Sequence, residues 1–164
     1  MINQFLTILV LLGLITSCNN RLRSYSKKRN TVEAYQQIND TTLMLTGISD
    51  NSNYGYSETS PILLGAYKVW DGAENIEKYL NALLGPNGEN IKYKRLEPCC
   101  PFKTKNFVDE IMPGVIFDGQ HGLLERYEIE YGDEFKTDSC ILFFNLYDET
   151  NQLMAPYGFT FKQN

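Results

Sequence analysis

The sequence predicts an α+β fold: a mainly antiparallel sheet of about four to six strands, with one principal helix packed on one of its faces. Three observations lead to this prediction. Eleven Tyr and nine Phe among 164 residues favour strands, because aromatic side chains fit half-buried pleated surfaces. One segment has helical periodicity, and several later segments alternate between apolar and polar residues.

The helix is predicted within the segment from Asp71 to Glu89. Apolar residues recur there at spacings of three and four and form one stripe: Ala73, Ile76, Leu80, Leu83 and Leu84. Asp71 is the expected N-cap, with Glu74 in the capping-box position. Gly85 is expected to close the helix in a left-handed conformation, and Pro86 prevents its continuation.

Strands are expected on both sides of this helix. The stretch 41–48 has the composition of a short strand, and 62–69 is a β-prone run that starts after Pro61. After the helix, 90–97, 123–134 and 157–161 alternate, with Tyr127, Ile129 and Tyr131 on one face of the second segment. The stretch 139–149 is apolar on both faces, which predicts the central strand.

The first seventeen residues are expected to be a lipoprotein signal peptide. Phe5 to Ile15 is an unbroken run of eleven apolar residues, whereas a membrane-spanning helix needs about 20. The next letters, "ITSC", resemble the bacterial lipobox, in which an aliphatic and two small residues precede Cys. This resemblance implies that Cys18 becomes the N-terminus after cleavage and carries palmitate-type acyl chains. An ordinary signal peptide or a short anchor is the alternative, because "MINQ" contains no Lys or Arg.

The charge distribution divides the remaining chain into a tether, 18–45, and a single α+β domain, 46–164. Five of the fifteen basic residues lie between Arg21 and Arg29, and the first acidic residue is Glu33. The tether is therefore basic and the domain acidic. A basic stretch next to a lipid can lie against anionic head groups, and a solvated linker is the other interpretation. The acidic domain argues against nucleic-acid binding.

The cysteines leave several interpretations open. With Cys18 lipidated, Cys99, Cys100 and Cys140 remain. They can be packed or free thiols, or one of the vicinal pair can crosslink to Cys140. A third alternative is a disulfide between Cys99 and Cys100 themselves, and a metal or redox role is the fourth. Zinc-ligand spacing and the two-residue spacer of a thioredoxin-type site are absent from the sequence.

His121 is the weak candidate for a general base, because it is the only His in the chain. Gly119 and Gly122 beside it indicate an exposed turn. A Cys–His nucleophilic pair with Cys99 or Cys100 is the catalytic interpretation. The sequence contains no phosphate-binding loop, dinucleotide fingerprint or calcium loop. We therefore expect no cofactor, no metal and no catalytic residue, and we favour a protein without enzymatic activity.

The segments "LLGPNGE" and "CCPF", with "YGYSE" at Tyr54 to Glu58 and "PYGFTF" near the end, resemble a family of small lipoproteins of Bacteroidota-type bacteria. The resemblance covers about Tyr54 to Phe161 and implies a cell-envelope lipoprotein without residue roles to transfer. Some relatives carry the label 3-deoxy-octulosonate phosphate aldolase. That chemistry resembles (β/α)₈ enzymes, which need about 250 residues in strand–helix alternation. This chain does not fit that label.

The resulting functional expectation is a lipid-anchored cell-envelope protein, on the periplasmic or surface face, that acts as a binding or interaction module. Its expected partners are the membrane, through the lipid on Cys18, and an envelope protein. The alternative is an envelope thiol enzyme or redox protein that uses Cys99 or Cys100. A structural role in a surface complex is the third hypothesis.

Overall fold

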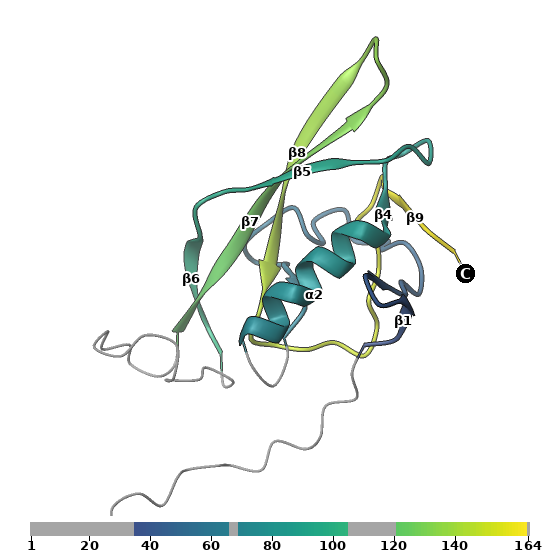
Figure 1. Ribbon diagram of the computed structural model, residues 1–164. Coiled ribbons are helices and arrows are strands. Elements are labelled where there is room, and N and C mark those ends of the chain that lie inside the picture. The colour runs from purple at the N-terminus through teal and green to yellow at the C-terminus, as the bar shows by residue number, and fades with distance from the viewer. Residues whose placement is uncertain (1–34, 66–68, 105–120, 164) are drawn as a thin grey trace, which may run out of the picture. The chain divides into compact units, whose positions relative to one another are not determined.

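The computed structural model describes residues 35–65, 69–104 and 121–163, which belong to one compact unit, Val32–Asn164. It is an α+β domain, as the sequence predicts (Figure 1). Cys18, the predicted signal peptide and most of the predicted tether lie outside the described residues.

A five-stranded sheet forms the centre of the domain. Its order is β3 (Ile62–Leu63), β8 (Thr137–Asn145), β7 (His121–Gly132) and β5 (Lys92–Arg95). The fifth strand, β6 (Cys99–Lys103), pairs with β7 on the same side as β5. Only the β3–β8 pair is parallel among these pairs. In Figure 1, β7 and β8 form a long twisted hairpin whose tip extends beyond the other strands.

The alternation predicted for β7 is confirmed. Tyr127 and Ile129 are buried, whereas Glu128 and Glu130 pair with Lys94 and Lys92 of β5 on the opposite face. Strand β8 lies between β3 and β7 and is central, also as predicted. One face of this hairpin therefore contributes to the core and the other faces away from it.

The single described helix, α2 (Val69–Ala82), packs against the buried face of the sheet. Ile76, Tyr79 and Leu80 are each no more than 1% exposed. The ring of Tyr79 meets Phe144 of β8 edge-on at 5.7 Å, and Phe144 meets Tyr127 of β7 in the same way at 5.5 Å. Aromatic rings favour this geometry because the positive edge of one faces the negative face of the other.

The predicted ends of the helix are wrong at both sides. Asp71 lies inside the first turn, where its charge still favours the positive helix terminus, and is not the N-cap. The helix stops at Ala82 because the next two residues form β4 (Leu83–Leu84), which pairs with β9 (Thr160–Phe161). Gly85 follows a strand, and the positive φ of the turn, 84°, belongs to Gly88.

The domain begins earlier than the expected boundary at Thr46. Strands β1 (Gln37–Asn39) and β2 (Thr42–Leu43) pair with each other. Leu43 and Leu45 are 0% and 4% exposed and belong to the same core as α2. The part of the predicted tether from residue 35 onward is therefore structured.

We expect Phe144→Ala to lower the free energy of unfolding by about 3–5 kcal/mol, because a fully buried ring with two aromatic neighbours is replaced by a cavity. Phe135→Ala at the hairpin tip is the matched control. Its side chain is 95% exposed, so the change should stay within about 0.5 kcal/mol. Urea denaturation of both variants measures the difference, and equal losses would contradict this assignment of the core.

Candidate functional site

The two adjacent cysteines form a disulfide with each other. Cys99 and Cys100 are joined at 2.11 Å between their sulfur atoms. Of the four interpretations left open by the sequence, the structure contains this one. Cys140 is a free thiol, so neither vicinal cysteine is crosslinked to it. Both sulfurs of the pair are also unavailable as free thiols in this state.

The disulfide lies at an irregularity of β6. Cys99 is opposite Leu124 of β7, whereas Pro101, two residues later, is opposite Leu123, so Cys100 is an extra residue in the ladder. Cys100 has a φ of 57°, the only positive φ of a non-glycine residue in the described ranges. This conformation costs a residue with a Cβ about 1–2 kcal/mol. The segment that carries the two cysteines is therefore a bulged strand.

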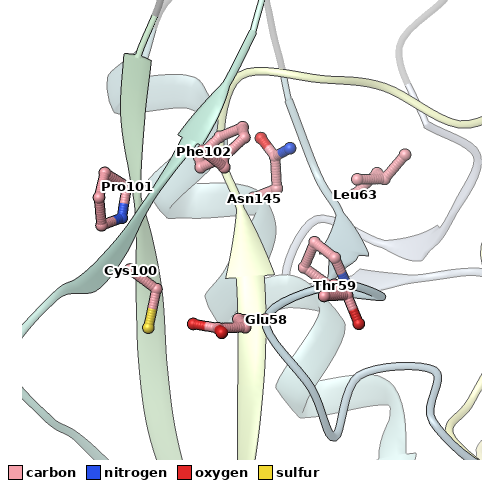
Figure 2. A pocket seen from close by; sticks show the side chains of 8 residues that line it. Glu58, Thr59, Leu63, Cys100, Pro101, Phe102 and Asn145 are labelled. Atoms are coloured by element: carbon pink, nitrogen blue, oxygen red, sulfur yellow. The ribbon is translucent and has the colours of Figure 1, made fainter.

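A pocket of about 710 Å³ lies beside this disulfide, and we call it the β6 pocket (Figure 2). One wall comes from β6, and the other residues come from the segment before β3, from β3 and from the end of β8: Cys100, Pro101, Phe102, Glu58, Thr59, Pro61, Leu63 and Asn145. Its volume falls in the range of small-molecule sites, about 300–1,000 Å³. The lining is apolar apart from three polar side chains.

The β6 pocket is on the face of the sheet that points away from α2. Phe144 contacts Tyr79 of the helix, so its neighbour Asn145 projects to the opposite face. In Figure 2 the helix lies behind the sheet, and the labelled pocket side chains are arranged in front of it. Core and pocket therefore use alternate residues of the same strand.

Asn145 is 2% exposed and is held in one orientation by hydrogen bonds. Its Oδ1 accepts the backbone N–H groups of Tyr147 (2.8 Å) and Asp148 (3.0 Å), which identifies it as the oxygen. Its Nδ2 donates to Asp148 Oδ2 at 2.9 Å, and the other Asp148 oxygen accepts from Thr104 at 2.8 Å. The second N–H of Asn145 has no hydrogen-bond partner among the described residues.

Cys140 is a half-buried residue in the middle of β8 and is no part of the β6 pocket. Burial raises the pKa of its thiol from 9.0 to about 11, because the thiolate is poorly solvated there. Since the thiolate is the reactive form, Cys140 is a poor nucleophile near neutral pH.

His121 is the first residue of β7 and not part of a turn, which corrects the expectation for this position. Its backbone is opposite Lys103, at the other end of β6 from Cys99, and three residues before Leu124. At about 3.3 Å per strand residue, its Cα lies roughly 10 Å along the sheet from that of Leu124. In this structure, moreover, no thiol is available at Cys99 or Cys100 for a Cys–His pair.

Two further findings concern the described ranges alone. No group of three or more His, Cys, Asp or Glu residues there is arranged to hold a metal ion. The helix of the described domain is not long and apolar enough to cross a membrane.

Sequence reasoning found Cys100 but missed the rest of the pocket. Glu58 and Thr59 are in a loop, and nothing in their surroundings in the sequence indicates a site. Asn145 carried a usable signal, since it is a polar residue directly after the apolar run "CILFF" of the central strand. A nearly fully buried amide at such a position requires partners, and here they include its neighbour Asp148.

In comparisons with protein-family models, with curated proteins and with solved structures, no significant match to the chain was found. The function therefore has to be argued from the site itself.

The positive φ of Cys100 generates a prediction about two double variants without the disulfide. We expect Cys99→Ser/Cys100→Gly to be more stable than Cys99→Ser/Cys100→Ser by about 1 kcal/mol, because glycine adopts positive φ without steric cost. Urea denaturation of the two proteins gives the difference. Equal stabilities would mean that the bulge does not require this conformation.

Cys140 generates a pH prediction. The folded protein binds the thiol proton more tightly than an ordinary cysteine does, so the thiolate fraction should keep rising about tenfold per pH unit from pH 8 to 10. The alkylation rate of Cys140 by iodoacetamide, followed by peptide mass spectrometry, should rise in parallel. In urea the rate should level off above about pH 9, and the same levelling between pH 9 and 10 in the folded protein would contradict the raised pKa.

Proposed function

We propose that this chain is a lipid-anchored protein of the cell envelope and that its α+β domain is a binding module for a small ligand. The observation that carries the binding role is the β6 pocket, whose size and mostly apolar lining with a few polar groups are typical of ligand sites. The anchoring rests on the lipobox-like "ITSC" sequence that ends at Cys18.

The architecture of the pocket supports this proposal. The site is built largely on strand ends rather than on one loop: β6 and β8 both pair with β7, and Leu63 of β3 pairs with Asn145 of β8. Side chains held by a sheet keep their positions, so the pocket does not have to form during binding. The ordering cost of binding is correspondingly small.

The anchoring is tested by metabolic labelling with an alkyne analogue of palmitate in a bacterium that processes lipoproteins. The wild-type chain should be labelled and should fractionate with membranes, whereas Cys18→Ala should lose the label. Cys140→Ala is the matched control and should label like the wild type. Equal labelling of Cys18→Ala and wild type would overturn the anchoring while leaving the binding role open.

The binding role is tested with a variant that blocks the pocket. Thr59→Trp places a large ring at an exposed position of the lining, and Thr41→Trp places the same ring at an exposed turn between β1 and β2. Ligand-observed NMR with a library of small amphipathic compounds should find binders of the wild type that Thr59→Trp loses and Thr41→Trp retains. A library with no such binder would overturn the proposal.

Thiol–disulfide exchange is the second candidate, and the observation in its favour is that Cys99 and Cys100 are already paired at the pocket wall. In this reaction a partner dithiol would give up two electrons and two protons and become a disulfide. The Cys99–Cys100 bond would break to two thiols. Treatment of the folded protein with dithiothreitol, followed by alkylation, measures the exchange. A disulfide that stays intact under conditions that reduce an exposed disulfide would exclude this role.

A further inference from the structure

We infer that the β6 pocket binds a neutral, polyhydroxylated ring, which means a saccharide, with one C–H face on the wall formed by the disulfide. This inference rests on the proposed binding role and names the class of ligand. It follows from the charge of the lining, from its apolar surfaces and from the pattern of its hydrogen-bonding groups.

The charge of the lining argues against anionic ligands. Among the described lining residues, Glu58 is the only one with an ionisable side chain, since Cys100 is tied in the disulfide. Among these described residues a phosphate or carboxylate would find no cationic partner, and it would lie near a carboxylate. An anion would have to give up part of its hydration beside the Glu58 carboxylate, with no cation among these residues to compensate, which is unfavourable.

The lining offers several apolar groups that can contact the C–H face of a ring. Cys100, Pro101 and Phe102 follow one another along β6 and present a disulfide, a saturated ring and an aromatic ring to the same pocket. Pro61 and Leu63 provide apolar surface from the segment around β3. Polarisable sulfur and aromatic rings attract the weakly positive C–H groups of a ring, and the saturated carbons add dispersion contacts.

The polar groups match hydroxyls better than they match an ammonium group. The Glu58 carboxylate only accepts hydrogen bonds, and the free N–H of Asn145 only donates. The Thr59 hydroxyl can do both and shares one hydrogen bond of 3.1 Å with the Ser57 hydroxyl. A ring with several hydroxyls can donate to Glu58, accept from Asn145 and form either kind of hydrogen bond with Thr59. An ammonium group could pair with Glu58 but has no acceptor to offer to Asn145.

Figure 2 shows how these groups are distributed. The Glu58 carboxylate and the Cys100 sulfur are toward one end of the pocket, and Asn145 is between Phe102 and Leu63 toward the other. Polar groups at both ends of an apolar surface suit a ligand whose faces are apolar and whose edge carries hydroxyls. The rigid amide of Asn145 would fix the orientation of that edge, because its other three hydrogen bonds hold it in place.

The test uses the purified full-length protein and three matched sets of probes in saturation-transfer NMR. The first set is glucose, galactose, mannose and their neutral disaccharides. The second contains the corresponding 2-amino sugars, and the third the corresponding 6-phosphates. Cyclohexanol and indole serve as apolar probes without a hydroxylated ring. Competition titrations give the affinities.

We expect at least one neutral saccharide to bind, with saturation strongest on the C–H groups of one ring face. Its phosphate should bind at least about tenfold more weakly, and its amine no more tightly. Glu58→Gln and Thr59→Val should each weaken binding about 3- to 10-fold, the first because a neutral amide oxygen is a weaker acceptor than a carboxylate and the second because one hydrogen bond is lost. Glu134→Gln, which changes an exposed acid at the hairpin tip, should leave binding unchanged.

Five results would overturn the inference. If an amino sugar binds tenfold more tightly than its neutral parent and Glu58→Gln removes that preference, the site selects a cationic ligand. If the phosphates bind best, the charge argument fails. If saccharides bind but both pocket variants behave like wild type, they bind elsewhere. If only cyclohexanol or indole binds and Thr59→Trp abolishes it, the pocket takes apolar ligands and the proposed function stands. Without any binder, both proposals fail.

Discussion

The edge-on contact of Phe144 with Tyr79 and Tyr127 is the interaction on which the rest of the structure depends. It ties the helix to both strands of the long hairpin and fixes which face of β8 is buried. Because neighbouring residues of a strand point to opposite faces, the burial of Phe144 determines that Asn145 projects to the other side. A shift of β8 by one residue would exchange the two and destroy core and pocket together.

The features of the fold that depend on local sequence patterns could be predicted from the sequence. Helical spacing predicts the buried face that contains Ile76 and Leu80. Strict alternation does the same for Tyr127 and Ile129 of the strand. The end of the helix could not be read, since Ala82 is its last residue only because Leu83 pairs with Phe161 from the far end of the chain. The pairing of β4 with β9 ends the helix at Ala82, although the local apolar pattern favours a longer helix.

The site was harder to predict from the sequence than the fold, for the same reason. Adjacent cysteines were visible in the sequence, but their connectivity was one of several alternatives, because spacing alone does not fix a disulfide. Glu58 and Leu63 are far from Asn145 in the sequence, and they meet it only because β3 pairs in parallel with the end of β8. Strand β3 has only two residues, so its parallel pairing with β8 leaves almost no pattern in the sequence.

The disulfide between neighbours also bears on how the chain matures. A crosslink between distant segments can form correctly only after the fold has brought them together, whereas Cys99 and Cys100 are next to each other in the extended chain. Their oxidation encloses no intervening residues, so it restricts the unfolded chain very little and acts on the local backbone. The pair can thus be oxidised before, during or after folding, and once it has formed, neither Cys99 nor Cys100 can make a wrong crosslink to Cys140.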